Sequence, residues 1–197
     1  MDDPATPRPS ALTKVLATAK RFAYSGLARE RWQHPRRVMA LLGITDGNRV
    51  LDLGAGAGYF SVKLARAVGE TGRVYAVEPD DDMRWMIERE ATRRGLGNVV
   101  TMTADDDAPE LPEPVDVVLV VNAFHHLPDP GVVMAGLVGQ LRPGGRLAVI
   151  EPQPRWYLFG HATEPEVIRS TLVDTGFSIA DEHDLLPRQS FIVAEPR

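Results

Sequence analysis

Cysteine is absent from this sequence, and several other features are scarce. The absence excludes disulfide bonds, thiolate metal sites and cysteine nucleophiles together, but is uninformative about the cellular compartment. Basic residues never form a run longer than a pair and the net charge is −5, so we expect no nucleic-acid partner and favour a small or neutral substrate. The polar, proline-rich start MDDPATPRPS is followed by no long apolar segment. Neither a signal peptide nor a membrane span is therefore expected, and a cytoplasmic location follows by default.

The length of the chain favours one domain. The 197 residues, 44% of them hydrophobic, suffice for one well-filled core and are short for two. We expect a single domain over residues 1–197, with an N-terminal tail and helical lid over 1–44 and the main core over 45–197. Whether the chain forms a homodimer is left open.

Apolar runs and turn residues predict strands that alternate with helices. The expected strands are Val50–Asp52, Arg73–Glu78, Asn98–Thr103, Asp116–Val121, Arg146–Glu151, Phe177–His183 and Phe191–Glu195. The expected helices are Ala11–Arg21, His34–Leu42, one from Phe60 to Val68, one opening at Pro79, Gly131–Leu141, and a last one capped by Thr163 with Glu166 and ended by Gly176. Between the first two helices, Ala23–Trp32 is a mixed segment, and a turn, RPGG, precedes the fifth strand.

This order predicts an α/β fold with a doubly wound sheet. Alternating strands and helices give a mostly parallel sheet with right-handed crossovers and helices on both faces. The run VVLVV within Asp116–Val121 is typical of a central strand covered on both faces. The last two strands follow each other without a helix, so we expect an antiparallel C-terminal strand inserted into the sheet.

The most informative stretch is VLDLGAGAGYF, from Val50 to Phe60. An apolar strand runs into Gly54, Gly56 and Gly58, and helical spacing then resumes at Phe60. Glycine tolerates positive φ and has no Cβ, so backbone N–H groups can approach a bound molecule at the start of the new helix. The alternative is a structural turn without a ligand.

Polar residues end each of the first five strands, where a doubly wound sheet places its ligand. They are Asp52 with the glycine loop, Glu78, the segment Thr103–Asp107, Asn122–His126, and Glu151. Glu78 lies 24 positions after Gly54, close to the offset of about 20 residues at which an acid meets ribose hydroxyls in nucleoside-binding folds. Its alternative role is to cap the helix that begins at Pro79.

These features together resemble the class I S-adenosylmethionine-dependent methyltransferases. The form Asp-x-Gly-x-Gly-x-Gly at 52–58 fits that family better than a dinucleotide-binding loop, because Tyr59 stands where a third dinucleotide glycine would be. Glu78, the acids after the third strand, the LRPGG turn and the terminal hairpin support the resemblance, which extends from about Val38 to Glu195. It implies a Rossmann-like, seven-stranded sheet, S-adenosyl-L-methionine as cofactor, and methyl transfer to a small-molecule acceptor.

The resemblance also implies roles for individual residues. Asp52 and the loop (Gly54, Ala55, Gly56, Gly58 and Tyr59) would hold the methionine part of the cofactor, with Asp52 facing its ammonium group. Glu78, followed by Pro79, would bind the ribose, Met83 would pack on the adenine ring, and Asp105 or Asp106 would bind the adenine amino group. Asn122 would lie near the methionine part and the reacting methyl group. The alternative for Asp105–Asp107 is a solvated loop.

The sequence NAFHHL after the fourth strand bears on the acceptor. It lacks the Asn/Asp-Pro-Pro-Tyr/Phe signature that resembles amino-group methylation of DNA bases or glutamine, and the missing cysteines remove the thiols of arsenite methyltransferases. Paired histidines here resemble the methyltransferases of quinone rings and other small molecules, so O- or C-methylation is favoured.

His125 and His126 are the titratable side chains expected nearest the chemistry, since histidine can accept a proton near neutral pH. His125 is the first choice for orienting or deprotonating the acceptor, and neighbouring side chains on a turn are expected to point in different directions. The alternative is that both histidines cap the loop and pack under the next helix. No spacing of His, Asp or Glu predicts a metal site.

Two aromatic segments are candidates for walls of the pocket. Trp156, Tyr157 and Phe159 follow the fifth strand, where the acceptor is expected, although core packing is an equal alternative. In the N-terminal region a lid over the cofactor is the favoured role of five residues, namely Phe22, Tyr24, Arg29, Arg31 and Trp32. A surface helix with incidental aromatics is the alternative there.

Two other functions use the same loop. A protein that binds S-adenosylmethionine without turnover needs the same binding residues and stays open. An NAD(P)-dependent oxidoreductase predicts a third glycine near position 59 and a second mononucleotide-binding half, and the sequence shows neither.

Overall fold

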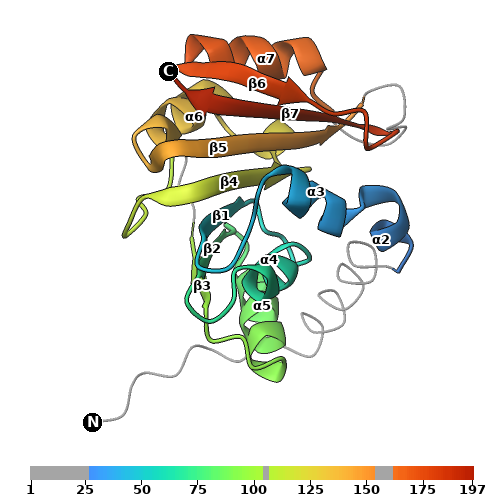
Figure 1. The fold of residues 1–197 in the computed structure, drawn as a ribbon, viewed down its shortest axis with the longest axis vertical. Helices are drawn as coiled ribbons and strands as arrows, with labels where there is room; N and C mark the ends of the chain where they lie inside the picture. The colour runs from blue at the N-terminus through green and yellow to red at the C-terminus, as the bar shows by residue number, and fades with distance from the viewer. Residues whose placement is uncertain (1–26, 104–106, 154–161) are drawn as a thin grey trace.

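The fold is built on one seven-stranded sheet in the order β3-β2-β1-β4-β5-β7-β6 (Figure 1). A computed structural model describes residues 27–103, 107–153 and 162–197. Only β7 runs antiparallel to both of its neighbours, which confirms the inserted C-terminal strand. The strands are β1 (Arg49–Leu53), β2 (Arg73–Val77), β3 (Val99–Met102), β4 (Val115–Val121), β5 (Leu141–Pro152), β6 (Phe177–Glu182) and β7 (Gln189–Pro196).

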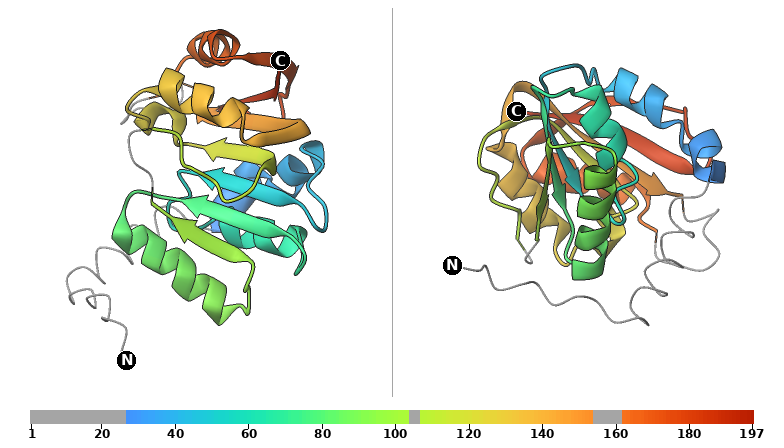
Figure 2. Two further views of the ribbon diagram at one scale, coloured as in Figure 1. Left: turned by 90° about the vertical axis from the view of Figure 1, so that its left-hand side faces the viewer. Right: turned by 90° about the horizontal axis from the view of Figure 1, so that it is seen from below.

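Helices cover both faces of this sheet, as predicted. Seen from below, α6 lies on one side of the sheet and α2 and α3 on the other (Figure 2). The helices are α2 (Leu27–Gln33), α3 (Pro35–Leu41), α4 (Ser61–Ala67), α5 (Asp81–Arg93), the short 3-10 helix η1 (Phe124–His126), α6 (Pro130–Val138) and α7 (Pro165–Asp174). None of these helices has the length and apolarity that crossing a membrane requires.

Strand β4 shows how the pattern of apolar residues builds the core. Val118 and Val120 point into the cluster formed with α6 and α7, whereas Val117, Leu119 and Val121 point into the cluster formed with α3 and α4. All five side chains are at most 7% exposed. Burying each contributes about 1.5–3 kcal/mol, so this strand anchors both layers.

Three local expectations were wrong. Thr163 does not cap α7, because Pro165 takes the first helical position and makes Glu164 the N-cap. Within the mixed segment Ala23–Trp32 the structure contains the start of α2, which continues to Gln33. The RPGG turn lies inside β5, as an irregularity between the pairs Val115↔Leu141 and Val117↔Arg146.

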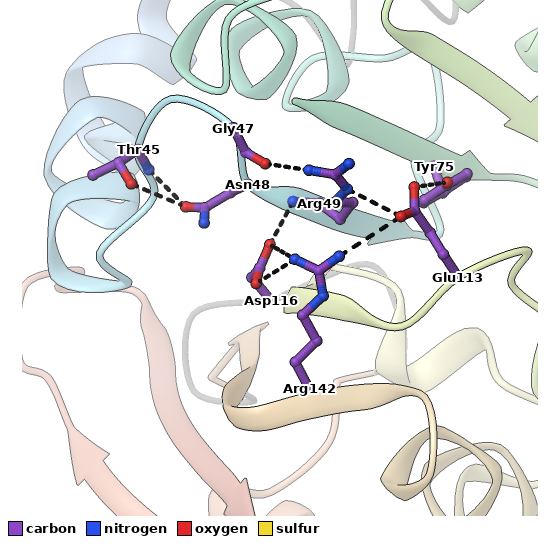
Figure 3. A network of polar contacts seen from close by, with 8 residues as sticks. All are labelled: Thr45, Gly47, Asn48, Arg49, Tyr75, Glu113, Asp116 and Arg142. Carbon is purple, nitrogen blue, oxygen red and sulfur yellow. Dashed lines mark hydrogen bonds and ion pairs between the residues drawn. The ribbon is translucent and has the colours of Figure 1, made fainter. Parts of the chain in front are cut away.

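At the amino-terminal ends of the strands, charged side chains form one network (Figure 3). Glu113 accepts hydrogen bonds from Tyr75 Oη at 2.7 Å and Arg49 Nε at 3.0 Å. Asp116 accepts from the Arg49 backbone N–H at 2.6 Å and from Arg142 Nη1 at 3.0 Å. The network ties β1, β2, β4 and β5 together at the edge opposite to the predicted site.

Candidate active site

A cavity of about 290 Å³ opens at the carboxyl-terminal ends of β1, β2 and β4. The order of the strands reverses between β1 and β4, which is the point where doubly wound sheets bind ligands. Five residues predicted for the site line this cavity, namely Gly54, Glu78, Pro79, Asn122 and His126. The topology therefore brings together residues that lie far apart in the sequence.

The three glycines of the loop serve different purposes. All have positive φ, at 72° for Gly54, 55° for Gly56 and 79° for Gly58. A Cβ on Gly54 would lie 2.3 Å from the Cβ of Ala123, and one on Gly58 would lie 3.0 Å from Ile87. A Cβ on Gly56 would meet nothing within 4 Å. Packing thus requires glycine at 54, and the positive φ of Gly58 together with the tight contact to Ile87 favours glycine there. Gly56 leaves open space where a ligand could approach the backbone.

Glu78 holds the glycine loop. Its Oε2 accepts a hydrogen bond from the N–H of Gly56 at 2.8 Å, and its Oε1 accepts one from the N–H of Asp80 at 3.1 Å. The cap of α5 is Asp80, which accepts from the N–H groups of Asp82 and Met83. The alternative role of Glu78 as the helix cap is therefore taken by a different residue.

Asp52 is buried under the loop's helix and does not line the cavity. The residue is 2% exposed, and the Ser61 hydroxyl donates to its Oδ2 at 2.6 Å. Burial raises the pKa of Asp52 to about 6, against the Ser61 hydrogen bond and the Arg29 charge, which both lower it. A carboxylate buried in this place favours a cationic partner.

Tyr59 joins the loop to α2. Its hydroxyl donates to Glu30 at 3.2 Å, and the guanidinium of Arg29 lies 4.3 Å from the centre of its ring. Lys63 pairs with Glu30 at 2.8 Å and, mainly through that hydrogen bond, holds the pKa of Glu30 below its ordinary value. Helix α2 therefore touches the glycine loop directly.

Met83 lies on α5 and is 8% exposed. It packs with Met86 and against Ala57 and Trp85, on the side of the glycine loop. Several predicted residues lie outside the residues that the structure describes: Phe22, Tyr24, Asp105, Asp106, Trp156, Tyr157 and Phe159.

Asn122 has an unusual backbone conformation for a residue with a side chain. Its φ is 55°, and its N–H donates to Ile150 at 2.8 Å. Its Oδ1 accepts a hydrogen bond from Gln189 Nε2 at 2.6 Å, and Gln189 in turn pairs with Gln33. These glutamines were not predicted from the sequence, since nothing in their local pattern links positions 156 residues apart.

His125 forms a buried pair with Glu151. Its Nδ1 lies 2.6 Å from Glu151 Oε2, and the two side chains are 5% and 0% exposed. Glu151 Oε1 also accepts from the N–H of Phe124 at 2.8 Å. The ring centres of His125 and His126 lie 4.0 Å apart, and the two rings are tilted by 44°. The tight turn of η1 brings them this close.

The two histidines nevertheless face different spaces. His126 lines the cavity of about 290 Å³, and His125 lines a second cavity of about 500 Å³ between η1, α6 and α7. Leu127 borders both. Across residues 27–103, 107–153 and 162–197 no three His, Asp or Glu side chains are grouped to hold a metal ion.

Comparison with known proteins agrees with this geometry. Residues 50–145 match a methyltransferase domain family. The chain is 35% identical over 115 residues to a ubiquinone/menaquinone biosynthesis C-methyltransferase of Teredinibacter turnerae, covering 56% of this chain and 45% of that protein. It is 36% identical over 115 residues to a protein-L-isoaspartate O-methyltransferase of Aeropyrum pernix, covering 57% and 42%. The chain thus spans about half the length of these relatives.

Solved structures share the fold. A SAM-dependent methyltransferase from Aquifex aeolicus superposes with a TM-score of 0.80 at 23% identity, over 89% of this chain and 96% of that one. A magnesium protoporphyrin IX methyltransferase from Synechocystis, with bound SAM, superposes with a TM-score of 0.67 at 21% identity, over 98% of this chain and 100% of that one. Residues 50–145 therefore carry the matched methyltransferase domain, and the strand order and the glycine loop agree with the class I S-adenosylmethionine-dependent methyltransferases.

Proposed function

We propose that this protein transfers a methyl group from S-adenosylmethionine to a small-molecule acceptor by O- or C-methylation. One observation carries the proposal: the cavity at the reversal of strand order is bounded by the glycine loop, by Glu78 and by Asn122. A carboxylate directly after β2 can accept hydrogen bonds from both hydroxyls of a ribose. The glycine loop, whose only side chains between Gly54 and Gly58 are those of Ala55 and Ala57, admits the rest of the molecule.

The residues present fit this cofactor. Gly56 leaves its side of the loop open, and the buried Asp52 gains from a nearby ammonium group. We assign the methionine part to Asp52 and to the loop formed by Gly54, Ala55, Gly56, Gly58 and Tyr59, the ribose to Glu78 with Pro79, and the adenine to Met83 with Asp105 or Asp106. When bound, the cofactor supplies a methyl group on a positively charged sulfur, which is already an activated leaving group.

The protein's main contribution is alignment. Methyl transfer is an in-line displacement, and holding the methyl group and the acceptor atom in line and in contact provides roughly 7–11 kcal/mol of the barrier reduction. Asn122 and His126 border the cavity on the side of β4, and His125 lines the neighbouring cavity on the other side of Leu127, so we place the approach of the acceptor on this side. The contacts of Arg29 and Glu30 with Tyr59 support a lid formed by the N-terminal segment.

His125 is our candidate for the base. Glu151 is fully buried beside Nδ1, so a proton on Nδ1 donates to that carboxylate and leaves Nε2 as the basic nitrogen. The ring of His126 lies 4.0 Å from that of His125, and His126 is the second candidate. With His125→Ala, we expect a rate at least tenfold lower with cofactor affinity unchanged, whereas a wild-type rate would contradict the assignment.

The relatives support a small acceptor without selecting one. Their names include a C-methyltransferase of quinone biosynthesis and an O-methyltransferase of isoaspartate. The direct test supplies the purified protein with S-adenosylmethionine and a metabolite extract, and searches by mass spectrometry for compounds that gain one methyl group. Binding without any methylated product would favour the non-catalytic alternative. A homodimer and a cytoplasmic location stay predictions.

A further inference from the structure

Two glutamines form a buried pair that the fold itself does not require. Gln33 at the end of α2 is fully buried, and Gln189 at the start of β7 is 3% exposed. Gln33 Nε2 donates to Gln189 Oε1 at 3.3 Å. Burying a carboxamide costs free energy that its hydrogen bonds at best offset, and apolar side chains would fill the same space without that cost. The pair is therefore a candidate for a role other than packing.

The hydrogen bonds of these glutamines run in one direction. Arg29 Nε donates to Gln33 Oε1, and a guanidinium group can only donate. The Gln33 amide must then turn its N–H₂ toward Gln189, so Gln189 turns its own N–H₂ toward Asn122. One cation on α2 thus sets the orientation of three amides in series.

The series ends at the cavity. Asn122 Oδ1 is held by Gln189 at 2.6 Å, and the residue lines the cavity with Gly54 and Glu78. Among the described residues no group accepts a hydrogen bond from Asn122 Nδ2. Because the oxygen faces Gln189, the N–H₂ group on the other side of the carboxamide is what Asn122 offers to a bound molecule.

We propose that Arg29, Gln33 and Gln189 are positioning residues that fix the Asn122 carboxamide as a hydrogen-bond donor to an oxygen of the molecule in the cavity. That this molecule is S-adenosylmethionine or its product rests on the proposed function. Since Arg29 also lies on the Tyr59 ring, α2 orders the loop and the donor together. A displaced α2 frees the amide to rotate.

Two substitutions reverse the series without removing volume. In Gln189→Glu the carboxylate only accepts, so Asn122 must turn its N–H₂ toward residue 189 and its oxygen toward the cavity. In Gln33→Glu residue 189 turns over to donate to the new carboxylate, and Asn122 turns over in consequence. Asn122→Asp removes the donor outright. Gln140→Glu, at the opposite edge of the sheet, is the matched control, since its carboxylate can still accept from the N–H of Leu111.

The test uses two measurements on the whole chain at pH 8. Calorimetric titration with S-adenosylhomocysteine should show at least tenfold weaker binding for Gln189→Glu, Gln33→Glu and Asn122→Asp, and no change for Gln140→Glu. The ¹⁵N–¹H signals of the Asn122 side chain, identified by their loss in Asn122→Asp, should shift and exchange more slowly in both glutamate variants without any ligand.

The outcomes distinguish a failure of the proposed amide series from a failure of the proposed function. Unchanged Asn122 signals in both glutamate variants would overturn the proposal that the amide series orients Asn122. Shifted signals together with wild-type affinity for S-adenosylhomocysteine would overturn it as well. If the wild-type protein binds no S-adenosylhomocysteine, the proposed function fails, while the Asn122 signals still decide whether the series of amides sets the orientation.

Discussion

The two ends of the parallel strands differ in how deeply their charged side chains are buried. At the amino-terminal end, Arg49, Glu113 and Arg142 pair with partners while keeping side-chain exposures of 31–36%. At the carboxyl-terminal end, Asp52 and Glu151 are at most 2% exposed. Partly exposed pairs stabilise a fold modestly, whereas buried carboxylates are costly unless every partner is in place. The first end therefore holds the sheet together, and the second carries the buried carboxylates of the proposed site.

The largest effect is expected at Glu151, where a buried acid serves two partners. Glu151→Leu leaves the N–H of Phe124 and the ring of His125 without their acceptor, and breaking such a pair costs about 3–5 kcal/mol of unfolding free energy. Urea unfolding measures the loss. Glu195→Leu, which breaks an exposed pair with Arg146, is the control and should cost less than about 1 kcal/mol. Equal losses would remove the contrast between buried and exposed charges.

Gly54→Ala tests whether packing dictates the loop. The new Cβ would lie 2.3 Å from that of Ala123 at a φ of 72°, so overpacking and left-handed strain together cost about 2–5 kcal/mol. Adding Ala123→Gly removes the clash and should recover about 1–3 kcal/mol in the same urea experiment. A double variant as unstable as Gly54→Ala would show that the clash is not the cause.

The pH dependence of stability should reveal the buried Asp52. Its pKa is raised from 3.8 to about 6, so between these values the folded protein binds more protons than the unfolded chain, and stability falls as the pH rises. The loss is complete above pH 6 and amounts to up to about 3 kcal/mol. Asp52→Asn should therefore be more stable than the wild type at pH 8, with no difference near pH 3, yet bind the cofactor more weakly. Lower stability of Asp52→Asn than of the wild type at pH 8 would contradict this.

The smallest effect is expected in the amino-terminal network. Arg142→Met removes a partly exposed contact to Asp116 and should cost at most about 1 kcal/mol, less at high salt. Cofactor affinity measured by calorimetry should not change, because this network lies at the far edge of the sheet. A change in affinity would show that the two ends of the strands are energetically coupled.

Much of the fold could be predicted because each strand carries its own signal. The continuous apolar run of β4, the glycines after β1 and the two consecutive C-terminal strands are local patterns, and the structure confirms the burial of β4 on both faces and the antiparallel C-terminal strand. The sequence signals for where a helix begins and ends were weaker. Thr163 was a plausible cap by composition, but Pro165 fixed the first turn of α7 one residue later.

The candidate site was predictable only where residues follow strands directly. Gly54, Glu78 and Asn122 meet because their strands are parallel neighbours. The pairs His125–Glu151 and Gln33–Gln189 depend on how β5, β7 and α2 pack, and no spacing in the sequence encodes such contacts. The buried amides in particular follow no local pattern.

The central claim is that the carboxyl-terminal end of the strands holds S-adenosylmethionine. Calorimetric titration of the wild type with S-adenosylhomocysteine should give one site with a dissociation constant in the micromolar range, which is a binding free energy of about −8 kcal/mol. A titration with NAD should show no binding. Gly56→Val, which fills the open side of the loop, should abolish binding, whereas Gly97→Val at the other end of the sheet should not. Wild-type protein that binds NAD but not S-adenosylhomocysteine, or folded Gly56→Val that binds as tightly as the wild type, would contradict the claim.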